Sequence, residues 1–114
     1  MTHGSTRQAL ILGLKYHLGD GVRQDDSRAA QFYQQAASQG DQQAQSNLGF
    51  MLEHGKGVAK DLSRAAIWYA LSASQGNALA QYNLANMYQK GEGVPRYAKK
   101  AVELYQLAVA QGYA

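Results

Sequence analysis

Two histidines and a neighbouring glutamate are the side chains best able to do metal or acid–base chemistry in this sequence. His17 and His54 each lie shortly before a glycine-rich turn, and Glu53 adjoins His54. A shared cation or a proton-transfer site would require these groups to converge. Imidazoles at helix ends have a simpler role, because a cation there complements the helix dipole. We therefore expect solvated helix-end side chains and no metal site.

The other candidates for catalysis have structural explanations. Asp25 and Asp26 could act as paired carboxylates, but both stand at the start of an expected helix, where acids bind free N–H groups. The Gly-x-Gly segments match neither a dinucleotide nor a phosphate-loop motif, and no serine lies in a nucleophile elbow. Cysteine is absent. The sequence therefore predicts a protein that is not an enzyme, with no catalytic residues and no cofactor.

Length and composition favour a single folded domain over residues 1–114. Hydrophobic residues make up 46% of the chain and charged residues 17%, proportions that argue against disorder. No apolar run approaches the ~20 residues that span a bilayer, so we expect no membrane insertion. The N-terminus lacks the pattern of a secretory signal, and the absence of cysteine fits both the bacterial cytoplasm and the periplasm.

The charge balance does not favour a nucleic-acid partner. Eleven Lys and Arg residues against eight Asp and Glu give a net charge of +3, which is too small by itself to indicate a polyanion. Helical repeats that read RNA align basic or hydrogen-bonding side chains along one groove. Here Lys56, Lys60 and the pair Lys99–Lys100 fall at turns and helix starts. We expect these lysines to be solvated.

The glycines reveal an internal repeat of 36 residues. Gly19, Gly55 and Gly91 share this spacing, and each is followed two residues later by a second glycine and then by valine. Leucines, alanines, tyrosines and Gln-Gly pairs keep the same spacing: Leu12, Leu48 and Leu84; Ala29, Ala65 and Ala101; Tyr33, Tyr69 and Tyr105; Gln39-Gly40, Gln75-Gly76 and Gln111-Gly112. The units therefore run over residues 6–41, 42–77 and 78–113.

Each unit shows two helical patterns around its Gly-x-Gly-Val turn. In the second unit we expect a first helix over residues 43–53, ended by Gly55 in the left-handed conformation. The second helix is expected over residues 62–74, capped by Asp61 or Ser63. The stripes expected to be buried are Ala44, Leu48, Met51 and Leu52 on the first helix and Ala65, Ala66, Trp68, Tyr69 and Ala73 on the second.

Small residues recur where neighbouring helix backbones must approach closely, because larger side chains there would force the helices apart. The set is Gly13, Gly49 and Ala85, together with Ala29, Ala65 and Ala101. Helix pairs that stack in register bury their faces only against their neighbours. The predicted fold is therefore all-α, a right-handed α-solenoid of three helix-turn-helix units with six antiparallel helices.

The second unit contains four diagnostic segments. They are Ala44-Gln45-Ser46-Asn47-Leu48-Gly49, Gly55-Lys56-Gly57-Val58-Ala59-Lys60-Asp61, Arg64-Ala65-Ala66-Ile67-Trp68-Tyr69 and Ala73-Ser74-Gln75-Gly76. Together they resemble the Sel1-like repeat, a relative of the tetratricopeptide repeat with a longer turn between its helices. The resemblance covers nearly the whole chain. It implies an adaptor or scaffold in bacterial signalling, secretion, envelope or host-contact systems, without naming a partner.

The third unit departs from this pattern at the start of its second helix. Tyr97 stands where Asp61 is an expected cap of the second unit, and Asp25 of the first. Pro95 enters the turn, and Leu104 replaces the tryptophan of the second unit. We expect these changes to shift the helix start by one or two residues.

The side of each first helix opposite its buried stripe predicts a concave face that binds a partner. Apolar side chains recur there, and such clusters mark interaction sites. The predicted residues are Arg7, Leu10, Leu14 and His17; Gln43, Ser46, Phe50 and Glu53; and Leu79, Tyr82, Asn86 and Gln89. Asn47 and Asn83 flank them, and either bind a peptide backbone or bond between neighbouring repeats. We predict a non-catalytic adaptor that binds a peptide or protein segment in this groove.

Other roles stay open. The chain could be a structural spacer or an oligomerisation segment of a larger scaffold, and a metal-dependent enzyme or RNA binder is a more distant alternative. The final helix carries an apolar set too wide for one buried stripe: Val102, Leu104, Tyr105, Leu107, Ala108 and Val109. We expect either a homodimer through this helix or a longer array whose next helix covers it.

Overall fold

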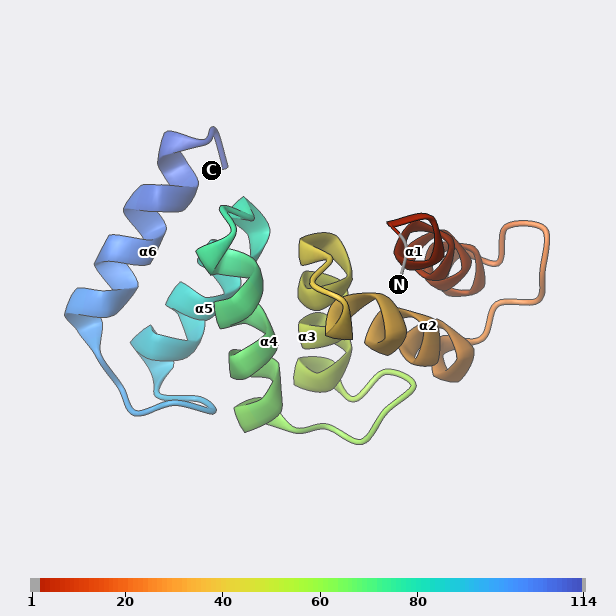
Figure 1. The fold of residues 1–114 in the computed structure, drawn as a ribbon. Coiled ribbons are helices and arrows are strands. Elements are labelled where there is room, and N and C mark those ends of the chain that lie inside the picture. Colours follow the sequence, from red (N-terminus) through yellow and green to blue (C-terminus); the bar gives the residue numbers. More distant parts are fainter. Residues whose placement is uncertain (1–2, 114) are drawn as a thin grey trace.

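Each 36-residue unit folds into a helical hairpin in the computed structural model, which describes residues 3–113. The helices are α1 (His3–Leu18) and α2 (Asp26–Ser38), α3 (Gln42–His54) and α4 (Leu62–Ser74), and α5 (Ala78–Lys90) and α6 (Ala98–Ala110). Every helix packs mainly against its neighbours in the chain, so the hairpins stack in a row with α1 and α6 at opposite ends (Figure 1). This is the all-α solenoid that the repeat predicts. None of the helices within residues 3–113 is both long and apolar enough to cross a membrane.

The helix ends of the second unit follow the predicted signals. The helix expected over residues 43–53 extends one residue further at each end, and the one expected over residues 62–74 has those bounds. Gly55 ends α3 with a φ of 67°, in the left-handed region that favours glycine. Asp61, rather than Ser63, caps α4, because its carboxylate accepts a hydrogen bond of 3.1 Å from the Arg64 backbone N–H.

The second helix of the third unit starts in register, and the expected shift was wrong. α6 begins at Ala98, 36 residues after the start of α4, although the Tyr97 side chain provides no cap. The backbone fixes this start instead. The Tyr97 N–H donates to the Tyr88 carbonyl at 2.9 Å, and the second unit makes the same bond at the corresponding place.

The core follows the expected stripes of both helix types. Ala44, Leu48, Met51 and Leu52 are buried on α3, and on α4 Ala65, Ala66 and Tyr69 are buried while Trp68 and Ala73 are half-buried. Leu12 differs from the other register leucines, because it is 37% exposed whereas Leu48 and Leu84 are 2% and 4% exposed. The reason is its place in the row: within the described chain, no second helix precedes α1.

Small residues let the two helices of a hairpin approach each other. A Cβ atom at Gly49 would lie 2.8 Å from the ring of Tyr69, and one at Gly13 would lie 2.6 Å from the ring of Tyr33. Both distances are shorter than van der Waals contact, so a larger residue would displace a buried tyrosine. The predicted close approach is therefore present in the first two units.

The second glycine of each turn sets the distance between neighbouring units. A Cβ atom at Gly57 would lie 2.3 Å from the Asp26 carbonyl oxygen at the start of α2, and one at Gly93 would lie 2.4 Å from the Leu62 carbonyl oxygen at the start of α4. Gly21, in the first turn, has no described neighbour within 4 Å of this position. The turn of each later unit therefore stacks on the second helix of the unit before it.

Candidate functional site

A cavity of about 150 Å³ opens between α1, α2, α3 and α5. Half of the fourteen residues predicted for the concave face line this cavity: Leu14, His17, Gln43, Ser46, Asn47, Phe50 and Leu79. Tyr33 from α2 and Met51 from α3 complete the lining. The structure thus brings together predicted residues from all three first helices.

A second hollow, of about 320 Å³, adjoins this cavity at Gln43. Its other lining residues are Thr6, Arg7, Leu10 and Asp41. We call the cavity and this hollow together the groove. Two large apolar side chains of the groove reach solvent, since Phe50 and Leu79 are each 39% exposed.

Most of the predicted residues further along the chain pack within the third unit. The Tyr82 ring lies against the rings of Tyr105 and Tyr113, with centroids 5.7 and 5.1 Å away. The Tyr105 hydroxyl donates to Gln89 at 2.7 Å and also contacts the side-chain oxygen of Asn86. In this unit, the chain's own aromatic side chains occupy the face that the sequence predicts for a partner.

The two flanking asparagines link neighbouring units. The Asn47 side chain on α3 lies near enough to the Tyr33 hydroxyl of the preceding unit to lower its pKa, and Asn83 on α5 acts in the same way on Tyr69. The Tyr69 hydroxyl donates to Glu53 at 2.8 Å. Of the two alternatives that the sequence leaves open, this proximity favours a contact between neighbouring repeats. Asn47 also lines the groove.

Burial controls the ionisation of the tyrosines at these junctions. It raises the pKa of Tyr33 to about 12. Two smaller effects act on the same pKa: the Asn47 side chain lowers it, and the negative charge of Asp26 raises it. Burial, followed by the bond to Glu53, raises the pKa of Tyr69 further. Both hydroxyls are therefore protonated at neutral pH and can donate hydrogen bonds.

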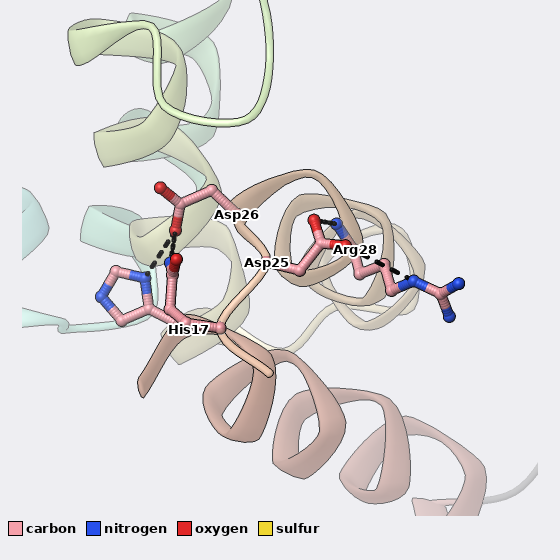
Figure 2. Close-up of polar contacts among 5 residues, drawn as sticks. His17, Asp25, Asp26 and Arg28 are labelled. Carbon is pink, nitrogen blue, oxygen red and sulfur yellow. Dashed lines mark hydrogen bonds and ion pairs between the residues drawn. The ribbon is translucent and has the colours of Figure 1, made fainter. Parts of the chain in front are cut away.

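The histidines pair separately and do not converge on Glu53. His17 Nδ1 on α1 lies 3.6 Å from the Asp26 carboxylate at the start of α2 (Figure 2). His54 Nε2 lies 3.8 Å from Glu53 on its own helix, and its ring packs on Phe50. Among the side chains of residues 4–113, no group of three His, Cys, Asp or Glu could hold a metal ion.

The expected solvation applies to one histidine more than to the other. The His54 side chain is 47% exposed. The His17 side chain is 36% exposed, but its Nδ1 atom is buried and makes no hydrogen bond within the described chain. His17 is therefore part of the groove wall as well as the end of α1.

The two neighbouring aspartates have separate structural contacts. Asp25 caps α2 by accepting a 3.1 Å hydrogen bond from the Arg28 backbone N–H, as predicted. Asp26 instead accepts a bond from the Gln24 side chain at 2.6 Å and faces His17. Figure 2 shows the two carboxylates on different sides of the helix start. They do not form a carboxylate pair.

Sequence reasoning missed Tyr33 and Met51 as cavity residues, and Thr6 and Asp41 in the adjoining hollow. Tyr33 was predicted only as a register position of the second helix, and Met51 only as part of the core. α2 packs against both α1 and α3, so a large side chain on its inner face can reach the gap between them. The position of α2 between two first helices was the signal from which Tyr33 could be found.

The last helix presents an apolar hollow that we call the α6 face. Its lining residues are Val102, Tyr105, Gln106, Val109 and Ala110, around a volume of about 430 Å³. Val102 and Val109 are 53% and 63% exposed. Leu104 was expected to be part of the excess apolar surface, but it is 7% exposed because it packs into the core at the register position of Trp68.

The repeat that organises this groove is found in other proteins. A family model described as Sel1 repeat matches residues 9–41, 42–77 and 78–113. The chain belongs to the Sel1 repeat family. The resemblance noted in the second unit is thereby confirmed over all three units.

Solved structures share the fold of this Sel1 repeat chain. A protective antigen of uropathogenic Escherichia coli strains, described as displaying an SLR fold, is 40% identical with a TM-score of 0.93, over 96% of this chain and 23% of that one. A Sel1 repeat protein from Oxalobacter formigenes is 38% identical with a TM-score of 0.86, over 96% and 82%. Cysteine rich protein B of Helicobacter pylori, at 21% identity and a TM-score of 0.76 over 98% and 92%, shares the fold alone.

Two curated relatives come from Arabidopsis thaliana. They are the ERAD-associated E3 ubiquitin-protein ligase components HRD3A and HRD3B, each 44% identical over 50 residues. The match covers 44% of this chain but only 7% of HRD3A and 8% of HRD3B. The Sel1 repeat chain thus corresponds to a small part of each relative.

Proposed function

We propose that this Sel1 repeat chain is a non-catalytic interaction module that binds an extended protein segment in the groove. Repeats of this family typically mediate protein interactions. One observation carries the proposal: Phe50 and Leu79, both 39% exposed, stand together on the wall of a cavity. Large apolar side chains that gather in a hollow are typical of interaction sites.

The groove offers a bound segment both apolar and polar contacts. Leu14, Phe50 and Leu79 provide apolar walls. Gln43 is exposed and borders both parts of the groove, so its amide can donate to and accept from the backbone of an extended segment. Arg7, which is also exposed, adds a charged donor at the outer end.

The relatives support a role within an assembly. HRD3A and HRD3B are described as components of a ubiquitin ligase, and a component holds contacts with other proteins. Because the matched segment is a small part of those proteins, the proposal takes from them only this general role.

Catalysis is not part of the proposal, because the titratable side chains near the groove already have structural partners. His17 faces Asp26, and Glu53 accepts a hydrogen bond from Tyr69. General acid–base catalysis needs a group free to exchange a proton with a substrate. These contacts support a binding surface rather than a reactive centre.

A peptide library tests the proposal. Short random peptides would be selected on the native chain, and the affinity of the best binder would be measured for the native chain and for Phe50→Ser combined with Leu79→Ser. Truncation of an interface hot spot commonly costs ~2 kcal/mol or more, so the double variant should bind about 30-fold more weakly or worse.

Ile67→Ser is the matched control for this test. Ile67 is 60% exposed on α4 and lies outside the groove, so the control removes apolar surface elsewhere. It should bind the selected peptide as tightly as the native chain does. Equal affinity of the native chain, the double variant and the control would contradict the groove proposal.

The α6 face favours a second function, self-association. α6 exposes Val102 and Val109 around its apolar hollow of about 430 Å³. Exposed apolar side chains that gather in a hollow are typical of interaction sites. We propose that two copies pair through their α6 faces, in contrast to a spacer role, in which that face would stay uncovered.

A further inference from the structure

One register position in the wall of the cavity holds a small residue. Ser46 stands on α3 at the position that Leu10 occupies on α1 and Tyr82 occupies on α5. In the third unit the Tyr82 ring extends from this position and packs on Tyr105 and Tyr113. In the second unit no ring extends from it, and the cavity opens beside Ser46.

The size of this space suits one six-membered ring. The cavity measures about 150 Å³, and an engineered apolar protein cavity of about 150 Å³ binds benzene. Leu14, Phe50 and Leu79 supply apolar wall for the faces of a ring. An indole would be too large for this volume, and a single methyl group would leave most of it empty.

The wall of the cavity also contains buried polar atoms that make no hydrogen bond within the described chain. They are Ser46 Oγ and His17 Nδ1, and both residues line the cavity. His17 Nδ1 faces the Asp26 carboxylate at 3.6 Å, which leaves Ser46 Oγ as the atom of this pair without a described partner. Ser46 is only 3% exposed. A ligand with a hydrogen-bonding group can give Ser46 Oγ a partner, whereas a purely apolar ligand leaves this buried hydroxyl without one, which is unfavourable. A ring with a hydrogen-bonding group is therefore preferred to a plain hydrocarbon ring.

The Tyr33 hydroxyl adds to this preference. In the second unit, Tyr69 donates its hydroxyl proton to Glu53. His17 occupies the register position of Glu53 in the first unit, and no described carboxylate accepts a hydrogen bond from Tyr33. The Asn47 side chain near the Tyr33 hydroxyl lowers its pKa, as a donor to the oxygen does, which leaves the hydroxyl proton for another acceptor. A ligand oxygen that both donates and accepts would match this wall.

A carboxylate side chain would fit the cavity poorly. Burying an ionised group in an apolar cavity is costly unless an opposite charge meets it. A carboxylate entering beside His17 would also approach Asp26, which already lies 3.6 Å from that ring. A phenol has the ring, the polar tip and no charge at neutral pH.

We infer that this cavity is the anchor site for a tyrosine side chain of the bound segment, with its ring between Phe50, Leu79 and Leu14 and its hydroxyl toward Ser46 and His17. The inference rests on the proposed function, because it names the residue by which a partner segment would be held in the groove. It also explains why the second unit alone carries serine at a position that is otherwise leucine or tyrosine.

Two small probes test the site directly. 4-Methylphenol and toluene are the side-chain analogues of tyrosine and phenylalanine, and each would be titrated into the native chain while backbone amide NMR shifts are recorded. We expect 4-methylphenol to shift the amides of Ser46, Asn47 and Phe50 and to bind about five- to tenfold more tightly than toluene, the effect of one net hydrogen bond. Equal or tighter binding of toluene, or shifts confined to other helices, would overturn the inference.

Two variants of Ser46 separate the ring site from the hydroxyl contact. Ser46→Leu copies the residue of the first unit, fills the cavity and should abolish the response to 4-methylphenol. Ser46→Ala keeps the space and removes the hydroxyl, so it should retain toluene binding and lose most of the preference for the phenol. Ser74→Ala, on the exposed end of α4, is the control and should behave as the native chain. If Ser46→Leu does not fold, a full phenol preference in Ser46→Ala still refutes the inference.

Library peptides distinguish this inference from the proposed function. Peptides that bind the groove should be enriched in tyrosine at one position, and Tyr→Phe at that position should weaken binding about five- to tenfold. Groove-binding peptides that carry leucine or no aromatic residue would refute the tyrosine anchor while supporting the groove as a binding site. If no peptide binds but 4-methylphenol still enters the cavity with the stated preference, the site is supported and the proposed function fails.

Discussion

Replacing Gly57 with alanine should destabilise the stack of the first two units, and the same change at Gly21 provides the comparison. Both glycines have positive φ values, 71° and 76°, where alanine is strained by ~1–2 kcal/mol. At Gly57 the added carbon would also lie 2.3 Å from the Asp26 carbonyl oxygen and 2.8 Å from the Ser27 nitrogen. Overpacking of this kind typically costs ~1–3 kcal/mol. We therefore expect a loss of ~1–2 kcal/mol for Gly21→Ala and ~2–5 kcal/mol for Gly57→Ala.

Urea unfolding followed by far-UV circular dichroism measures both losses on the same scale. Gly93→Ala should resemble Gly57→Ala, because its added carbon would lie 2.4 Å from the Leu62 carbonyl oxygen. Equal losses at all three positions would refute the reasoning, since they would show that the left-handed conformation alone accounts for the cost. In that case the turn glycines would not set the distance between units.

Three further predictions follow from the packing, the buried tyrosines and the α6 face. Gly49→Ala should destabilise the chain by ~1–3 kcal/mol in urea because its Cβ would lie 2.8 Å from the Tyr69 ring; a gain, as helix propensity alone would give, would contradict this. Burial raises the pKa of Tyr33 from 10.0 to about 12, so the folded chain holds the hydroxyl proton more tightly than the unfolded chain does. The stability that this adds is fully present below pH 10 and is lost as the pH rises toward 12. Between pH 9 and pH 11 the free energy of unfolding should therefore fall less in Tyr33→Phe than in the native chain, and an equal fall would contradict this prediction. Light scattering should show that the native chain is a dimer and that the double variant Val102→Lys with Val109→Lys is a monomer. The control Leu107→Lys, whose site lies outside the hollow, should remain a dimer. A native chain that stays monomeric at high concentration would exclude pairing through α6.

The fold was predictable because its signals are local and repeated. Glycine at a left-handed helix end and aspartate at a helix start act within a few residues, so Gly55 and Asp61 predict the ends of α3 and α4 nearly to the residue. The start of α6 was not predictable in this way. It depends on a backbone hydrogen bond from Tyr97 to Tyr88, which no side-chain pattern records.

Burial at the ends of the row depends on neighbours that a repeat pattern does not contain. Leu12 keeps the register of two buried leucines but is exposed, because the described chain places no helix on that side of α1. Leu104 was expected on the surface because it belongs to a broad apolar set, yet it fills the core position of Trp68. A periodic pattern shows which face of a helix is apolar, but the packing of the other helices determines whether that face is covered.

The candidate site was predictable as a face but not as a cavity. The helical wheel placed Leu14, Phe50 and Leu79 on one side, and the structure brings these three together. It could not give the contribution of Tyr33, which comes from a second helix. It also could not show that Tyr82 is held by rings of its own unit.

The central claim, that the groove binds a protein segment, is tested most directly by mapping a bound peptide on the chain. A library-selected peptide would be titrated into the isotopically labelled chain while backbone amide shifts are recorded. The account predicts shifts centred on Leu14, Ser46, Phe50 and Leu79, with the exposed face of α4 unchanged. Saturable shifts confined to α4 or α6, with the groove amides unmoved, would contradict it.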